Sequence, residues 1–188
     1  MFLSGKTLTT ANHLTVIRLT SIPILIFLLF FPQRLPSMLA AMVFLLASLT
    51  DFLDGFFARR WHQVSTLGKV LDPLADKLLV TAALIMLIPQ GRVPAWMAFV
   101  IIAREIAITG LRSIFLTEGI IITPSVWGKG KFGLQVLAIF ALIIHYPYLG
   151  INFHTIGTFL LWFALTVTLL SGFGYFANFY KYLQKKQD

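Results

Sequence analysis

Four aspartates lie in two pairs within a short stretch of the chain. Asp51 and Asp54 are separated by two residues and Asp72 and Asp76 by three, and they make up four of the seven acidic residues. A charged carboxylate near the centre of a bilayer costs about 2.5–3.5 kcal/mol, and the surrounding sequence is strongly apolar. Oxygen ligands suit Mg²⁺, Mn²⁺ or Ca²⁺. We therefore expect these carboxylates to hold two divalent cations, which would balance their four negative charges.

The first pair is spaced for one face of a helix. Asp51, Asp54, Gly55 and Ala58 follow at i, i+3, i+4 and i+7, so both carboxylates and both small residues share that face. The small residues leave room beside the acids. The alternative is close helix packing through Gly55 and Ala58.

The second pair belongs to the next helix. Asp72 and Asp76, at i and i+4, share a face there, and a short hairpin would bring the two pairs together. Pro73 follows Asp72 directly, so an N-cap role for Asp72 is the alternative. That role accounts for one acid of the four.

Phosphate chemistry fits the residues around these pairs. Arg59 offers a guanidinium that forks onto phosphate oxygens, and Gly68 permits close backbone approach or simply a turn. Metal ions in a carboxylate site stabilise the charge that develops on phosphate oxygens and align the reacting groups. The pattern therefore indicates transfer on a diphosphate, with lipid on one side of it and a water-soluble group on the other.

A second group of charges lies further along the chain. Arg104 and Glu105 stand inside an apolar segment, as a structural ion pair or as part of a substrate pocket, and intramembrane ionisable residues favour the pocket. Arg112 keeps roughly the face of Arg104, and Lys129 and Lys131 precede the next apolar segment. Together they could bind a second phosphate; the alternative is that Arg112, Lys129 and Lys131 only set the topology.

Composition indicates an all-α, polytopic membrane protein. The chain has 188 residues, 58% of them hydrophobic, and a length that suits six transmembrane helices in a single domain, residues 1–188. The absence of cysteine excludes disulfides and thiolate metal sites. Its net charge of +8 is better explained by anionic lipid and topology than by nucleic acid. The predicted helices cover residues 14–31, 36–59, 71–88, 94–115, 132–146 and 153–179.

The positive residues predict the orientation. With a cytoplasmic N-terminus, Arg34 and Arg92 lie outside, and the other 13 of the 15 lysines and arginines fall toward the inside. Both termini are then cytoplasmic, and the aspartates face the cytoplasm from the inner membrane. Residues 1–10 are either an interfacial helix or a frayed end.

The aspartates belong to a longer pattern that resembles a known family. Asp-x2-Asp-Gly-x2-Ala-Arg-x8-Gly-x3-Asp-x3-Asp, from residue 51 to residue 76, matches the signature of the CDP-alcohol phosphotransferases at all eight positions. The resemblance implies a homodimer of six-helix subunits that replaces the CMP of CDP-diacylglycerol by an alcohol. It also implies two Mg²⁺ or Mn²⁺ ions on the four aspartates, with Asp76 as the base that activates the alcohol. The implied CDP site comprises Gly55, Ala58, Arg59 and Gly68, together with Asn12 and Thr15 of an N-terminal Asn-x2-Thr-x2-Arg stretch.

The flanking residues resemble one branch of that family. Residues 103–105 and 128–131 are similar to the branch whose acceptor is sn-glycerol 3-phosphate, which implies that Arg104, Arg112, Lys129 and Lys131 bind the acceptor phosphate. Phe132 departs from this branch, which usually has threonine there. Other acceptors therefore stay open, phosphatidylglycerol in a cardiolipin synthase or an inositol phosphate. More distant alternatives are an intramembrane prenyltransferase and a cation transporter.

Overall fold

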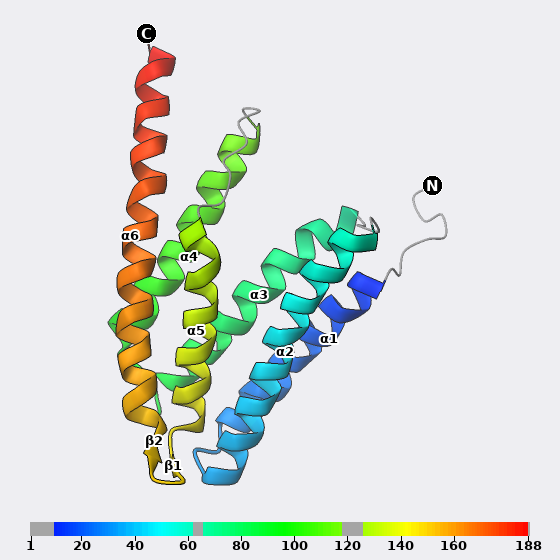
Figure 1. Cartoon of the computed structure of the whole chain (residues 1–188), viewed down its shortest axis with the longest axis vertical. Coiled ribbons are helices and arrows are strands. Elements are labelled where there is room, and N and C mark those ends of the chain that lie inside the picture. The colour runs from blue at the N-terminus through cyan, green and yellow to red at the C-terminus, as the bar shows by residue number, and fades with distance from the viewer. Residues whose placement is uncertain (1–9, 62–65, 118–125, 188) are drawn as a thin grey trace.

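Six helices run through the part of the chain that the structure describes (Figure 1). The structure is a computed structural model, which describes the backbone of residues 10–61, 66–117 and 126–187, and the side chains of residues 15–50, 74–75, 77–111, 113–115, 132–173 and 184. The helices are α1 (Thr10–Leu29), α2 (Arg34–Trp61), α3 (Thr66–Leu87), α4 (Ala95–Thr117), α5 (Val126–Ile144) and α6 (Phe153–Gln187). The predicted helical fold is thus confirmed.

The helices extend beyond the apolar segments that predicted them. α3 begins at Thr66 rather than at residue 71, and α5 at Val126 rather than at 132. Apolar pattern marks where a helix is buried or meets lipid, whereas backbone hydrogen bonding continues into polar sequence. The residues of the aspartate motif therefore lie on helices where the structure describes them.

One short β-ladder was not predicted. β1 (Pro147–Tyr148) and β2 (Ile151–Asn152) pair antiparallel between α5 and α6. Leu149 and Gly150 at the tip have φ values of 51° and 78°, as the primed turns of two-residue hairpins require. The hairpin turns the chain sharply, so that α5 and α6 lie side by side (Figure 1).

Packing joins the helices into one bundle. α1 packs on α2 and α3, α2 also contacts α5, and α4 packs on α6. A continuous apolar core runs through the contacts, including Leu25, Phe44, Leu84, Met97 and Leu142. This core fixes the relative positions of α2 and α3, which carry the aspartates.

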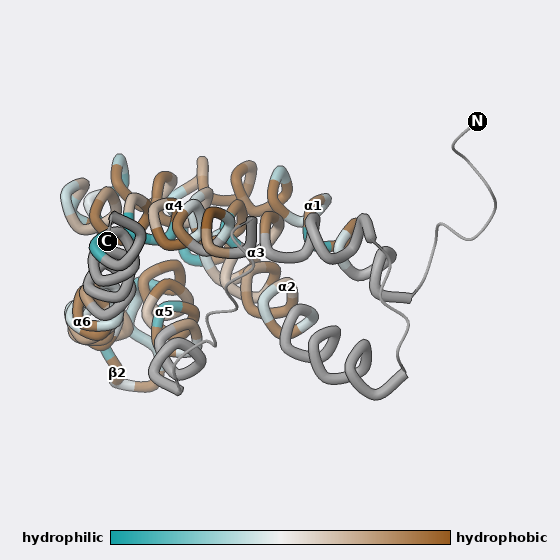
Figure 2. Tube along the Cα trace, turned by 90° about the horizontal axis from the view of Figure 1, so that it is seen from above, coloured by the Kyte–Doolittle hydropathy of each residue, from teal (hydrophilic) through white to brown (hydrophobic). Residues whose placement is uncertain are grey.

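Large apolar side chains also cover the outside of the bundle. Phe99, Phe159 and Phe173 are 72%, 73% and 79% exposed, and hydrophobic residues recur along several helices when the molecule is seen from above (Figure 2). Arg18 and Gln135 are instead buried. An outer surface rich in large apolar side chains is unusual for a soluble domain and suits a lipid environment.

Helix length gives a stricter criterion for a membrane span. Among the described residues, Phe153–Phe173 in α6 is long and apolar enough to cross a bilayer. Shorter apolar helical stretches of 10–17 residues are Thr15–Leu29, Arg34–Thr50, Lys77–Leu87 and Phe132–Ile144.

Three interhelical turns meet at the end of the bundle that carries the β-ladder. Arg92, from the turn between α3 and α4, is 3% exposed and donates to Ile143 O at 2.6 Å and to Ser37 Oγ at 3.1 Å. Gln90 Nε2 donates to Leu29 O at 2.5 Å. Arg92 lies in a turn as predicted, but it binds the carboxyl end of α5, where a cation is stabilising.

Candidate active site

The aspartate motif lies on α2 and α3. Asp51 and Asp54 are in the second half of α2, and Asp72 and Asp76 are within α3, all with helical backbone. Each pair therefore has the spacing of a shared helical face. The four side chains lie outside the described ones, so their meeting in one site stays a prediction.

The other residues of the predicted CDP site are also on helices. Gly55, Ala58 and Arg59 continue α2, and Gly68 is in the first turn of α3. Gly68 therefore has helical backbone in this structure, and the close approach of a ligand to it stays a prediction. The side chains of Ala58 and Arg59 lie outside the described ones.

α1 brings buried polar groups to the start of this motif. Thr15 and Arg18 are 1% and 0% exposed, and Arg18 Nε donates to Ala47 O at 3.3 Å. Ala47 is one helical turn before Asp51. The face of α1 predicted to line the nucleotide site thus points into the bundle beside α2, although the side chain of Asn12 lies outside the described ones.

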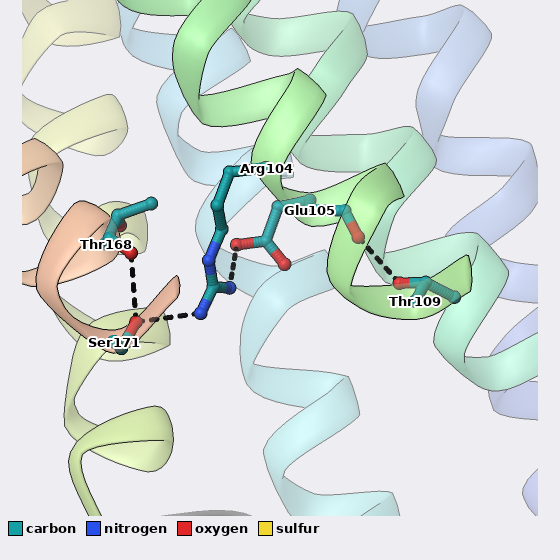
Figure 3. A network of polar contacts seen from close by, with 5 residues as sticks. All are labelled: Arg104, Glu105, Thr109, Thr168 and Ser171. Carbon is teal, nitrogen blue, oxygen red and sulfur yellow. Dashed lines mark hydrogen bonds and ion pairs between the residues drawn. The ribbon is translucent and has the colours of Figure 1, made fainter. Parts of the chain in front are cut away.

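Arg104 connects α4 to α6 (Figure 3). One guanidinium nitrogen lies 3.0 Å from Glu105 Oε1, and the other donates to Ser171 Oγ at 2.7 Å. The Ser171 hydroxyl in turn donates to Thr168 O at 3.0 Å. The ion pair between Arg104 and Glu105, which the sequence left open, is therefore present.

The α6 contact of Arg104 was missed at the sequence level. A serine, Ser171, in the largely apolar first part of α6 was the signal available, since a half-buried hydroxyl there favours a polar partner. Binding of an acceptor phosphate by Arg104 stays a prediction.

The remaining predicted phosphate-binding residues lie at helix ends. Arg112 is in the second half of α4, and Lys129 and Lys131 are in the first two turns of α5. Their backbone is helical, and their side chains lie outside the described ones.

A cavity of about 140 Å³ opens between α3, α4 and α5. Lys77, directly after Asp76 in the chain, lines it, together with Glu105 and Gln135. Sequence reasoning singled out Glu105 but not Gln135. The remaining lining residues are Val80, Thr81, Ile101, Ile102 and Phe132.

A metal site needs several donor side chains close together. The side chains that the structure describes contain no group of three or more His, Cys, Asp or Glu that could hold a metal ion. The four aspartates of α2 and α3 stay the predicted donors, because their hard oxygen ligands suit Mg²⁺ or Mn²⁺.

Comparison with known proteins decides the family. Residues 8–170 match the family model for CDP-alcohol phosphatidyltransferases. The chain belongs to this family. It is therefore an enzyme, a phosphatidyltransferase of phospholipid synthesis, as the motif predicted.

Named relatives cover most of the chain. A CDP-diacylglycerol–glycerol-3-phosphate 3-phosphatidyltransferase of Bacillus subtilis is 38% identical over 180 residues, 89% of this chain and 93% of the relative. The protein of that name from Rickettsia bellii is 37% identical over 172 residues, 91% of this chain and 95% of the relative. A probable phosphatidylglycerophosphate synthase of Mycobacterium tuberculosis is 33% identical over 172 residues, which cover 89% of this chain and 80% of the relative. The similarity is thus spread along the whole family domain.

Proposed function

We propose that this phosphatidyltransferase uses CDP-diacylglycerol as donor and sn-glycerol 3-phosphate as acceptor, giving phosphatidylglycerophosphate and CMP. The observation that carries the proposal is the 37–38% identity over about nine tenths of the chain to relatives named for this reaction. The acceptor is the part of the proposal that needs a direct test, because Phe132 stands where this branch usually has threonine.

In the proposed site, Asp51, Asp54, Asp72 and Asp76 hold two divalent cations, Mg²⁺ or Mn²⁺. The cations supply charge stabilisation for the diphosphate and for the CMP that leaves. The CDP group is bound by Gly55, Ala58, Arg59, Gly68, Asn12 and Thr15. Burial of Thr15 on the face of α1 that turns toward α2 supports this arrangement.

Asp76 is the proposed general base. Its carboxylate takes the proton of the acceptor hydroxyl while that oxygen bonds to the phosphorus next to diacylglycerol, and the bond from this phosphorus to the CMP oxygen breaks. Arg104, Arg112, Lys129 and Lys131 hold the acceptor phosphate. The contacts of Arg104 with Glu105 and Ser171 orient its guanidinium between α4 and α6.

We further infer the setting of the reaction. The whole chain forms one membrane domain of six spanning helices in the cytoplasmic membrane, with both termini and the aspartates on the cytoplasmic side, and it works as a homodimer. The turns between α1 and α2, between α3 and α4, and between α5 and α6 meet at one end, which supports an alternating path of the helices through the bilayer.

The experiment is an acceptor panel with purified protein. CMP release from CDP-diacylglycerol and Mg²⁺ is measured with glycerol 3-phosphate, phosphatidylglycerol, inositol phosphate or no acceptor. The proposal expects release with glycerol 3-phosphate. Release with phosphatidylglycerol but not with glycerol 3-phosphate would reassign the enzyme to cardiolipin synthesis.

A further inference from the structure

Gln135 of α5 has a buried side-chain amide whose NH2 group lacks a hydrogen-bond acceptor among the described residues. The residue is 2% exposed, and its Nε2 has no hydrogen-bond partner among the described residues. Burying an amide donor without a partner is unfavourable. A bound group that accepts a hydrogen bond would remove this cost.

The amide lines a cavity large enough for such a group. About 140 Å³ is available between α3, α4 and α5, whereas a single water needs only about 10–15 Å³. Val80, which also lines the cavity, follows Asp76 by four residues in α3. It is therefore one helical turn, about 6 Å, further along the axis on the face that carries Asp76.

The walls of the cavity are of two kinds. Val80, Ile101, Ile102 and Phe132 supply apolar surface, and polar side chains interrupt it. Lys77 and Glu105 carry opposite charges, so the wall has no net charge. This combination fits a neutral group that is apolar apart from an acceptor oxygen, and it fits a free polyol poorly because every hydroxyl would need a partner.

We propose that Gln135 donates a hydrogen bond from Nε2 to an ester carbonyl of the diacylglycerol part of the donor lipid. This inference rests on the proposed function, in which the diacylglycerol is attached to the phosphorus that reacts beside Asp76. An ester carbonyl accepts and has no proton to donate, so it satisfies the amide without adding a new unpaired donor. Gln135 is then a positioning residue for the lipid, one turn deeper than the chemistry.

A comparison of ester and ether donor lipids tests whether Gln135 binds an ester carbonyl. The KM of purified protein is measured for CDP-diacylglycerol and for the matching CDP-dialkylglycerol, which lacks both carbonyls, at saturating glycerol 3-phosphate. In the unaltered protein the ether lipid should have a KM about five- to tenfold higher, the scale of one lost hydrogen bond. In Gln135→Leu the KM for the ester lipid should rise by the same factor, so that the two lipids have equal KM values.

Controls separate lipid binding from folding. Gln135→Leu replaces an unpaired buried amide by an apolar side chain, so its Tm should stay equal or rise, and Gln135→Met provides a second variant without the donor. Gln90→Leu, at the other end of the bundle, removes a donor that is already paired with Leu29 O. It should lower the Tm and keep the preference for ester over ether.

The outcomes that overturn the inference are distinct. Retained ester preference in both Gln135 variants, or an increase in the KM for glycerol 3-phosphate alone, would show that Gln135 does not bind the lipid ester. Failure of the unaltered protein to release CMP from either lipid would instead overturn the proposed function.

Discussion

Arg18 Nε lies 3.3 Å from the carbonyl oxygen of Ala47, one helical turn before Asp51. The guanidinium is fully buried, so this contact joins α1 to the part of α2 from which the aspartate motif starts. We therefore predict that Arg18 helps to position the part of α2 that leads into Asp51.

Substitution of Arg18 should weaken both the helix contact and the reaction. Because a hydrogen bond from a charged donor contributes about 1.5–3 kcal/mol, Arg18→Met should lower the free energy of unfolding by that order. It should also lower kcat, since the start of the motif would shift. Arg18→Lys keeps the charge and should restore part of the stability but less of kcat. Unchanged Tm and kcat in Arg18→Met would show that the contact positions nothing.

Asp76→Asn should abolish turnover. The change removes the proposed base and one metal ligand at nearly constant volume, and loss of a general base alone costs about 10²–10⁴-fold in rate. CMP release from CDP-diacylglycerol measures the effect. Asp188→Asn, beyond residues 8–170 of the family match, is the control and should keep full activity. Substantial turnover by Asp76→Asn would remove Asp76 from the role of base.

Gly157→Ala should destabilise the contact between α5 and α6. A Cβ at Gly157 would lie 2.7 Å from Leu142 Cγ and 2.9 Å from Leu142 N, too close for the backbone of α5 to stay in place. Gly110→Ala is the matched control, because nothing lies within 4 Å of a Cβ there. In a helix, alanine should stabilise that site by about 1 kcal/mol. Thermal unfolding in detergent compares them, and equal Tm values would contradict the close packing.

Acidification should destabilise the turn cluster around His145. The pKa of His145 is lowered below its ordinary value of 6.5, mainly by burial. The charges of Arg92 and of the neighbouring His154 lower this pKa further. The other groups beside it are Tyr146, at 5.3 Å between ring centroids, and Arg34, whose guanidinium lies over the Tyr146 ring. The unfolded chain then takes up a proton at a higher pH than the folded protein does.

Protonation of His145 therefore favours the unfolded chain. The contribution of neutral His145 to the free energy of unfolding is complete above pH 6.5 and is lost as the pH falls through the lowered pKa of the folded protein. His145 has a φ of 59°, a conformation that asparagine tolerates, so His145→Asn is the suitable variant. Its Tm should fall less between pH 7.5 and pH 5 than that of the unaltered protein. An equal fall in both would locate the pH dependence elsewhere.

Apolar pattern and motif spacing were enough to predict the helices and the family. The predicted helix starts at residues 71 and 132 were wrong by several residues, since α3 begins at Thr66 and α5 at Val126. Polar sequence can continue a helix without any periodic apolar signal. The β-hairpin at Leu149 and Gly150 was missed. Its turn needs positive φ at both residues, and of the two only glycine adopts positive φ readily.

Contacts between distant helices could not be predicted. The contact of Arg104 with Ser171 joins residues 67 positions apart, and the burial of Gln135 depends on how α3, α4 and α5 pack. Neither follows from local spacing. Conversely, the meeting of the four aspartates in one site is still a prediction from spacing and family, because their side chains lie outside the described ones.

The most direct measurement of the central claim follows the acceptor oxygen. Purified protein is incubated with CDP-diacylglycerol, Mg²⁺ and sn-glycerol 3-phosphate labelled with ¹⁸O in its primary hydroxyl, and the masses of both products are determined. Attack of that hydroxyl on the phosphorus next to diacylglycerol predicts labelled phosphatidylglycerophosphate and unlabelled CMP. Label in CMP, or absence of phosphatidylglycerophosphate from a folded protein with metal present, would contradict the account.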